Sequence, residues 1–598
     1  MKIRILAFLM VLVLTLGMLV ACKPDEGTDD PVKGEGGGGD EVIVEDTHYD
    51  SIYWDEDTFI FKLSENSNQQ ELPSTCARYL AGDTDIGLLE GEFPDDIDDM
   101  VDVRNDDATK VTKINPTYVY IEDDGAIHGW GQNINDMVYD SANFVAGYTP
   151  DAYVNFVYDM LCASLSGAFA NLKTSSVATD GKKSNYFRFV DPKFKDTGEN
   201  YMVEYMRSLS LSRNKQYCLS SDYFTDMVRA FFVVPVNVNL LESIPASTTE
   251  GVFNYDYDGD GLYELEDFYE YVYEGKWSYA TLAEISASNF FQESGVDAES
   301  DDPNGDLHDR LIFAIGESSG LSSSGMLYTT SVTIIARELV ELEGPDGTKY
   351  NDYVYTYPTD NPDLYAFCDA LTSLMSENKG VISITNNQTE GYYSGNALLA
   401  IRNRFTNNRI LFGGDICLGS LEYLEYREMD DGFGVVPVPL FRTVDEDGAP
   451  ERYMTQIHNV GRIGAINAKT LKFGKISAYL DYQSMNSTEI LEEYYTFKLS
   501  HDVAGGGDNK EMLNYIRSNV RTSFDKAFED AIGRLFANAD NGAQGEGTSS
   551  EKQKWHALIK EGHFEVDAGA MAELYNSYIG SKGERLDSLE ASYVGLPE

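Results

Sequence analysis

Residues 256–267 place acidic side chains at the spacing of a calcium-binding loop. Such loops bind the ion through positions 1, 3, 5, 7, 9 and 12, and a glycine at position 6 permits the sharp turn. Gly261 occupies position 6. The six ligand positions hold Asp256, Asp258, Asp260, Leu262 (through its carbonyl), Glu264 and Asp267. The segment before the loop reads as extended and the one after it as helical, so the sequence predicts a site for one structural calcium ion. A solvated acidic turn is the alternative.

Other sequence patterns are weaker evidence for a catalytic or metal-binding site. Residues 316–320 read Gly-Glu-Ser-Ser-Gly after the apolar run 311–315, which places Ser318 where a serine hydrolase carries its nucleophile. The serine-rich segment that follows is a poor helix start, and this disfavours a hydrolase. Residues 302–309 begin like a second calcium loop, but Leu307 stands where glycine is needed, so we expect a polar turn. The seven histidines form no zinc-binding pattern.

The composition narrows the class of ligand. The chain has 45 Lys and Arg against 100 Asp and Glu, a net charge of −55 that repels nucleic acid and anionic headgroups. It also has 40 Tyr and 29 Phe. Aromatic faces stack on sugar C–H groups and carboxylates accept hydrogen bonds from hydroxyls, so this composition suits a neutral polyhydroxylated ligand. The six cysteines contain no C-x-x-C pair, and we expect buried free thiols rather than disulfides.

The N-terminus reads as a lipoprotein signal. Lys2 and Arg4 precede the apolar run 5–20, which ends in Leu-Val-Ala-Cys with the cysteine at Cys22. We expect removal of residues 1–21 and attachment of lipid to Cys22. Residues 22–46 are acidic and glycine-rich, which predicts a flexible tether. The remaining body, residues 47–598, would then lie on the extracytoplasmic face of the cell membrane, held by the lipid anchor.

Within the body, short apolar runs alternate with helical patterns, so the predicted fold class is α/β. The predicted strands are 186–190, 231–234, 311–315 and 433–439. The predicted helices are 149–172, 361–376, 474–485, 508–519 and 524–538. The acidic residues 95–107 read as a surface loop.

Several segments between residues 201 and 527 resemble, in order, those of extracellular solute-binding proteins of the carbohydrate-importer group. The matching segments are 217–222, 236–241, 274–279 (EGKWSY, similar to G-K-W-T-W), 394–399, 426–439 (ending in DGFGVVPVP), 493–495 and 509–513. The chain departs from the family pattern at Val238 and Tyr279, and residues 47–200 match poorly. The resemblance implies a two-lobed periplasmic-binding-protein-like fold (type II) with a hinge, and lobes that are discontinuous in sequence.

The same resemblance implies a function and a binding site. The chain would be the substrate-binding component of an ABC importer, with permease subunits as partners and without enzymatic activity. It would capture a carbohydrate between its lobes, and the calcium loop would be a clamp inside one lobe. The candidate ligand-binding residues are Asp222, Asn237, Trp130 and Tyr393, with Tyr453 behind them. A glycoside-acting enzyme remains an alternative, as does an adhesion protein that uses the dockerin-like calcium loop for recognition.

Overall fold

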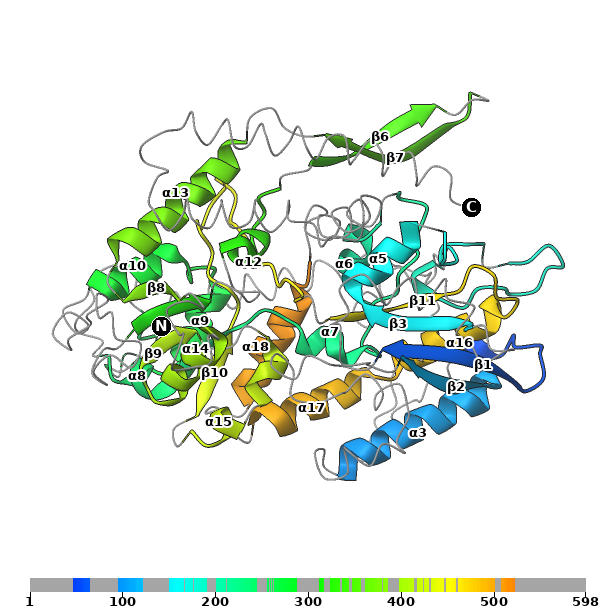
Figure 1. The fold of residues 1–598 in the computed structure, drawn as a ribbon, viewed down its shortest axis with the longest axis horizontal. Helices are drawn as coiled ribbons and strands as arrows, with labels where there is room; N and C mark the ends of the chain where they lie inside the picture. Colours follow the sequence, from blue (N-terminus) through cyan, green and yellow to red (C-terminus); the bar gives the residue numbers. More distant parts are fainter. Residues whose placement is uncertain are drawn as a thin grey trace, which may run out of the picture. The chain divides into compact units, whose positions relative to one another are not determined.

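The computed structural model describes residues between positions 47 and 521, apart from the longer stretches 65–94, 122–149, 191–200, 245–254, 288–310 and 385–396 and several shorter ones. The chain divides into two units, residues 1–47 and residues 48–598, and the fold below is that of the second. The predicted signal, the tether and the helix expected at 524–538 lie outside the described residues. Figure 1 shows the course of the chain.

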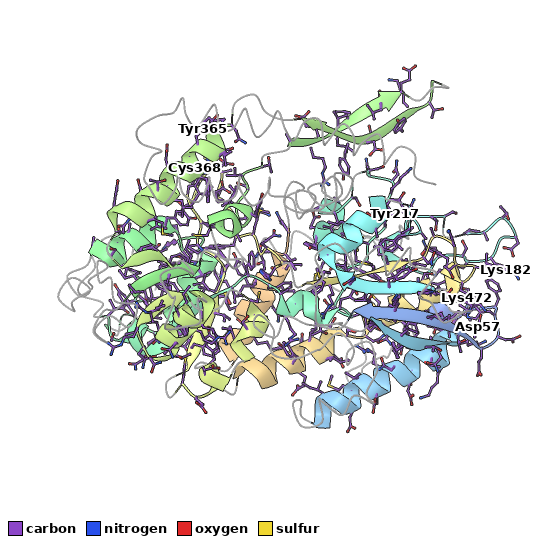
Figure 2. All side chains as sticks on the ribbon, in the orientation of Figure 1. Asp57, Lys182, Tyr217, Tyr365, Cys368 and Lys472 are labelled. Carbon is purple, nitrogen blue, oxygen red and sulfur yellow. The ribbon has the colours of Figure 1, made fainter. Side chains whose placement is uncertain are left out.

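The first sheet has four strands in the order β11-β3-β1-β2. Its strands are β1 (Asp57–Ser64), β2 (Ile114–Ile121), β3 (Ala152–Phe156) and β11 (Arg462–Ile466). β1 pairs in parallel with β2 and β3, whereas β11 is antiparallel to β3. Helices α3 (Asp95–Thr112), α5 (Val157–Leu165) and α16 (Phe473–Met485) contact this sheet. The start of β1 is also held electrostatically, because Lys475 Nζ lies 2.6 Å from the Asp57 carboxylate. Lys472 Nζ lies 3.6 Å from the same carboxylate, and Figure 2 labels Asp57 and Lys472.

The second sheet has five strands in the order β10-β4-β9-β5-β8. Its strands are β4 (Val234–Asn237), β5 (Leu311–Gly316), β8 (Val381–Ile384), β9 (Ile410–Gly413) and β10 (Phe433–Val436). The helices that follow or cover them are α8 (Val238–Glu242), α9 (Leu265–Tyr273), α10 (Tyr279–Ala287), α12 (Ser323–Tyr328), α13 (Pro362–Glu377), α14 (Ala397–Thr406) and α15 (Leu424–Arg427). Every residue of β4, β9 and β10 is buried, which explains their continuous apolar sequences. The predicted α/β class is confirmed.

Other helical elements precede, connect or follow the strands of the two sheets. These are η1 (Thr47–Tyr49), η2 (Arg188–Val190), α6 (Val203–Ser208), α7 (Thr225–Arg229), η6 (Leu418–Glu422), α17 (Thr488–Ser500) and α18 (Gly507–Ser518). A separate antiparallel hairpin consists of β6 (Ala336–Glu343) and β7 (Lys349–Thr356) and belongs to neither sheet.

The strand expected at 231–234 is displaced to Val234–Asn237 (β4), because Phe231 and Phe232 form only isolated bridges. Three further predicted elements are wrong. Residues 186–190 are not a strand, because the backbone N–H groups of Tyr186 and Arg188 donate to the side chains of Ser477 and Asp481 instead of to a neighbouring strand. The helix expected at 149–172 begins only at Val157, since residues 152–156 form the buried strand β3. The acidic segment 95–107 is not a loop but most of α3.

The chain crosses between the sheets more than once, and the crossing segments lie side by side. It passes from the first sheet to β4 through residues 217–233 and returns from β10 to β11 through residues 437–461. The first segment bridges the second at Phe231 and Ile457, and it bridges β11 of the first sheet at Leu219 and Gly464. A Cβ atom on Gly464 would lie 2.5 Å from the Phe224 ring, so the close approach requires glycine.

A third crossing runs through α17 and α18. α17 packs against α3 beside the first sheet, and α18 packs against β10 in the second. The residues after α18 then return to the same place, because Thr455 donates its N–H to Asn519 O (2.9 Å) and accepts one from Arg521 (3.1 Å). The two sheets are therefore joined by three connections that bond to one another.

Candidate ligand-binding site

The calcium-like loop folds around its first residue. The Asp256 carboxylate accepts hydrogen bonds from the backbone N–H groups of Gly259 (2.7 Å) and Gly261 (3.1 Å). Both glycines have left-handed φ angles, +81° and +92° respectively, which the turn requires. Position 1 of the loop is thus turned inward and position 6 makes the sharp turn that the sequence predicted.

The last ligand position closes the loop against a helix. α9 begins at Leu265, and Asp267 lies in its first turn, mostly buried. Its carboxylate accepts a hydrogen bond from the Tyr257 N–H at 3.2 Å, so positions 2 and 12 are joined. Buried Tyr255 and Tyr263 stack with their ring centroids 4.1 Å apart beneath the loop.

The structure thus places Asp256, Glu264 and Asp267 on one loop at the start of α9, while Asp258, Asp260 and Leu262 lie outside the described residues. Among the residues that are described, no three His, Cys, Asp or Glu side chains are grouped to hold a metal. Carboxylate and carbonyl oxygens suit a hard cation such as Ca²⁺. Calcium binding stays a prediction.

Asp222 lies in the first crossing segment and is fully buried. It contacts α17 and α18, the two helices of the third crossing. One of its oxygens accepts a hydrogen bond from Thr488, the first residue of α17, at 2.9 Å and forms an ion pair with Arg517 in the last turn of α18. The neighbouring Ser221 accepts a hydrogen bond from Ser484 Oγ at 2.7 Å. These contacts fasten α16, α17 and α18 to the first crossing segment.

Asn237 ends β4 and caps α8. Its side-chain oxygen accepts the Leu240 N–H at 3.0 Å, and its amide donates to Phe405 O (3.1 Å) and to Asn408 Oδ1 (2.8 Å). These bonds explain why asparagine follows the strand, since it caps one helix and fixes the end of α14.

Tyr453 is 2% exposed and donates its hydroxyl to Trp277 O at 3.1 Å. Burial raises the pKa of its phenol well above the usual value, and the nearby Tyr515 raises this pKa further. Trp130 and Tyr393, together with Cys22 and Ser318, lie outside the described residues. The ligand-binding roles of Asp222, Asn237, Tyr453, Trp130 and Tyr393 stay predictions.

Two segments of the family resemblance form one structural unit. The indole N–H of Trp277 donates to Pro437 O at 2.8 Å, and Trp277 O accepts the Leu440 N–H at 3.1 Å. Tyr279 N–H then donates to Leu440 O at 2.8 Å. Trp277 is fully buried, as expected of a packing residue. The turn at 274–279 and the segment 433–439, which contains β10, therefore form one support for the second sheet.

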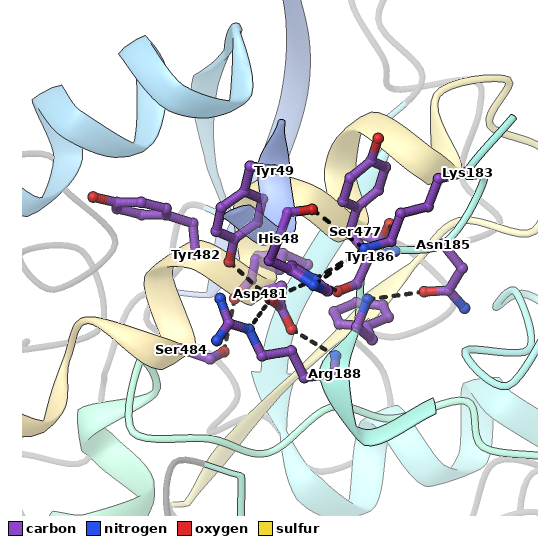
Figure 3. A network of polar contacts seen from close by, with 12 residues as sticks. His48, Tyr49, Lys183, Asn185, Tyr186, Arg188, Ser477, Asp481, Tyr482 and Ser484 are labelled. Carbon is purple, nitrogen blue, oxygen red and sulfur yellow. Dashed lines mark hydrogen bonds and ion pairs between the residues drawn. The ribbon is translucent and has the colours of Figure 1, made fainter. Parts of the chain in front are cut away.

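Sequence reasoning missed a buried polar cluster centred on Asp481 of α16 (Figure 3). The fully buried Asp481 carboxylate accepts hydrogen bonds from Tyr49 Oη (2.8 Å), Arg188 N (2.8 Å), Arg188 Nε (3.2 Å) and the Tyr201 hydroxyl. Four hydrogen-bond donors, from three segments that are distant in sequence, therefore stabilise the single negative charge of Asp481. The signal in the sequence was a lone aspartate on the apolar face of a helix, and its partners could not be identified because they lie about 280 to 430 residues away.

His48 completes this cluster beside Lys183. Its Nε2–H donates to Tyr186 O at 2.7 Å, so its Nδ1 accepts from the Lys183 ammonium at 3.1 Å, and His48 Nε2 lies 3.5 Å from Asp481. This arrangement is that of a neutral imidazole. Burial lowers the pKa of His48, although Asp481 acts in the opposite direction. The cluster fastens the first residues of the body to α16, and its chemistry is structural.

Among the residues that the structure describes, no helix is both long and apolar enough to cross a bilayer. Cys218, Cys368 and Cys417 are buried free thiols. For Cys218 and Cys368, burial raises the pKa of the thiol above its usual value.

No protein-family model and no curated protein matches the chain. Among solved structures, the chain is similar to the GacH receptor of Streptomyces glaucescens, with 11% identity, 84% of this chain and 99% of the other covered, and a TM-score of 0.39. It is similar to the maltose-binding protein MalE of Listeria monocytogenes (11% identity, 86% and 99% covered, TM-score 0.40).

A third similar structure is the galacto-N-biose/lacto-N-biose I-binding protein of an ABC transporter from Bifidobacterium longum (9% identity, 90% and 99% covered, TM-score 0.43). These are proteins of the kind that the sequence resembles. The TM-scores are below 0.5, so no residue is assigned a role from these alignments.

Proposed function

We propose that this chain is the substrate-binding component of an ABC importer and captures an extracellular carbohydrate. The observation that supports it most strongly is the pairing of the crossing segments. Two sheets are joined by three connections that bond to one another at Phe231 and Ile457 and at Thr455 and Val520. Connections that lie at one place leave each sheet and its helices free to rotate as a body about that place, which is how a hinged binding protein closes over a ligand.

The ligand class follows from composition and from the predicted residues. In this proposal Trp130 and Tyr393 supply aromatic faces for a sugar ring. Asp222, Asn237 and Tyr453 bond to the protein itself, so they hold the framework around the ligand. The net charge of −55 favours a neutral ligand over a polyanion.

The proposal also covers location and metal. A lipid on Cys22 would anchor the chain on the extracytoplasmic face of the membrane, where residues 22–46 would let the body reach the permease. One Ca²⁺ would be held by the carboxylates of Asp256, Asp258, Asp260, Glu264 and Asp267 and by the Leu262 carbonyl. Its role would be to hold the acidic turn together at the start of α9, and the inward Asp256 and the two left-handed glycines support this assignment.

Thermal unfolding of the full chain, purified in detergent, tests the function against a panel of mono- and oligosaccharides. We expect one structural class of sugar to raise the melting temperature, because a ligand that binds only the native state stabilises it. The sugar should be recovered unchanged after incubation. Consumption of the sugar would establish a glycoside-acting enzyme instead, and a panel without any stabilising sugar would overturn the carbohydrate assignment.

A further inference from the structure

The β6–β7 hairpin is inserted between α12 and α13, in the half of the molecule that contains the second sheet. The chain enters it after α12 and leaves it for α13, which packs beside β8. Asn361, the N-cap of α13, donates to Thr333 O at 2.8 Å, so the two ends of the insertion are tied together. The hairpin itself lies apart from both sheets (Figure 1).

The hairpin nevertheless bonds to the residues that follow α6. Asp352 of β7 accepts hydrogen bonds from Ser212 Oγ and from the Arg213 N–H, both at 2.8 Å. Arg337 of β6 donates to Arg207 O (2.9 Å) and Ser210 O (3.1 Å), and its guanidinium lies 4.3 Å from the centroid of the Tyr353 ring. Both strands of the hairpin therefore contribute to one contact.

The segment on the other side of this contact is hydrogen-bonded, through its neighbours, to the first sheet. Leu172 donates its N–H to Gln216 O at 2.6 Å, and Leu219 donates to Gly464 O in β11 at 2.8 Å. Ala170 donates to Ile466 O, also in β11, at 2.8 Å. A hairpin from the second half is thus bonded, at residues 207–213, to a segment that precedes the first crossing and is itself bonded to the first sheet.

Asp352 is the central residue of the contact, because its carboxylate lies among several positively charged side chains. Lys173, which donates to Arg213 O at 2.7 Å, stands near the side chains of Arg207, Arg213 and Arg337 and the carboxylate of Asp352. Burial, and then Arg207 and Arg213, lower the pKa of Lys173 to about 8, while Asp352 acts in the opposite direction. Glu204 pairs with Arg207, and Asp352 is the carboxylate from the hairpin that offsets part of the remaining positive charge, in a chain whose net charge is −55.

The contact is polar, which allows it to break and re-form. Leu339, Tyr350 and Val354 on the hairpin remain 50%, 43% and 36% exposed, so its apolar side chains contribute little to docking. Hydrogen bonds and ion pairs exchange readily for water, whereas a large apolar interface does not.

We propose that the β6–β7 hairpin is a latch between the two halves of the molecule, and that Asp352 sets how tightly it holds. The proposal rests on the proposed hinged binding function. With the latch engaged, the halves are held near one another. With it released, they rotate about the crossings and admit solute. The latch therefore determines the fraction of ligand-free molecules that are open, and hence the apparent affinity for the solute.

The test measures the ligand-free full chain. Spin labels on noncanonical amino acids at positions 177 and 444, whose valines are 55% and 50% exposed, report the distance between the halves by pulsed electron paramagnetic resonance. Asp352→Ala should shift the distance distribution toward the open form at least twofold in population. Glu338→Ala removes an exposed carboxylate from the same face of the hairpin and should leave the distribution unchanged.

Ser212→Ala is a second variant that removes one bond of the latch from the other side and should shift the distribution in the same direction by less. Circular dichroism confirms that each variant is folded. An Asp352→Ala distribution identical to that of the wild type would overturn the latch, as would an equal shift in Glu338→Ala. Because no solute is added, this failure is separate from a failure of the sugar panel, which would overturn the binding function and leave the latch measurement standing.

Discussion

Trp277 and Pro437, 160 residues apart, are joined by a 2.8 Å hydrogen bond from the indole N–H to the carbonyl oxygen. Proline has no N–H to donate to a strand, but its carbonyl remains an acceptor. The run Pro437-Val438-Pro439 therefore ends the pairing of β10 after Val436 and turns a carbonyl toward the tryptophan. The segments 274–279 and 433–439, which the sequence analysis identified separately, therefore form one structural support for the second sheet.

Trp277→Phe tests this support. The substitution leaves Pro437 O buried without its donor and removes part of the indole, so we expect a loss of about 1–3 kcal/mol in the free energy of unfolding. Urea denaturation followed by circular dichroism measures it. Tyr53→Phe is the control, because Tyr53 is 51% exposed and should change stability by less than about 0.5 kcal/mol. Equal losses in the two variants would contradict the assigned role of the bond.

The sequence predicted best those elements whose side-chain pattern alone decides their structure. β5, β10, α13, α16 and α18 begin and end within about three residues of the expected bounds, because each is an apolar run or a clear helical repeat. The sequence did not predict α3, because its many acidic residues obscured the helical spacing of its buried side chains. Its buried positions Ile97, Val101, Arg104 and Ala108 follow a helical spacing in which an arginine stands among the apolar residues.

The site was less predictable than the fold. The calcium-like loop could be located because its ligands lie within twelve consecutive residues. The Asp481 cluster could not, since Tyr49, Arg188 and Tyr201 reach one carboxylate only after the chain has folded. Buried polar groups require partners, but the sequence does not say which ones.

Calcium should stabilise the chain through the loop at 256–267. If the affinity lies in the range of extracellular modules, about 10⁻⁴–10⁻³ M, then calcium at about thirty times the dissociation constant adds about 2 kcal/mol. We expect EGTA to lower the melting temperature of the wild type and to have no effect on Asp256→Asn, whose carboxylate organises the loop. Asp107→Asn, an exposed carboxylate change on α3, should respond to EGTA like the wild type. A wild type that is indifferent to EGTA would contradict calcium binding.

His48 should make stability fall in mild acid. Burial lowers its pKa below the usual 6.5, so the unfolded chain binds a proton that the folded chain does not. The stabilisation is complete above about pH 6.5 and is lost as the pH falls toward the lowered value. Burial penalises the imidazolium and Lys183 and Arg188 repel it, although Asp481 and the Tyr186 carbonyl favour it. Thermal unfolding between pH 5 and 7.5 should therefore show a shallower fall for His48→Gln. Ser51→Ala, which removes a bond to Tyr186 without removing a titrating group, should keep the wild-type slope.

The Asp222–Arg517 pair should be worth far more than an ion pair on the surface. Arg517→Met removes a cation from a fully buried carboxylate that also accepts a hydrogen bond from Thr488, and we expect a loss of about 3–5 kcal/mol in the free energy of unfolding. The matched control is Lys510→Met on the same helix, because the Lys510–Glu492 pair is about two-fifths exposed and should contribute less than about 1 kcal/mol.

The double variant Asp222→Leu with Arg517→Met removes both charges together, so it should be less destabilised than the sum of the two single variants. Equal losses for Arg517→Met and Lys510→Met in urea denaturation would show that the pair does not fasten the third crossing. If the expected order holds, Asp222 acts at the junction of α17, α18 and the first crossing segment. In the proposed hinged binding protein, a change there would alter how the two halves rotate even without direct contact with the solute.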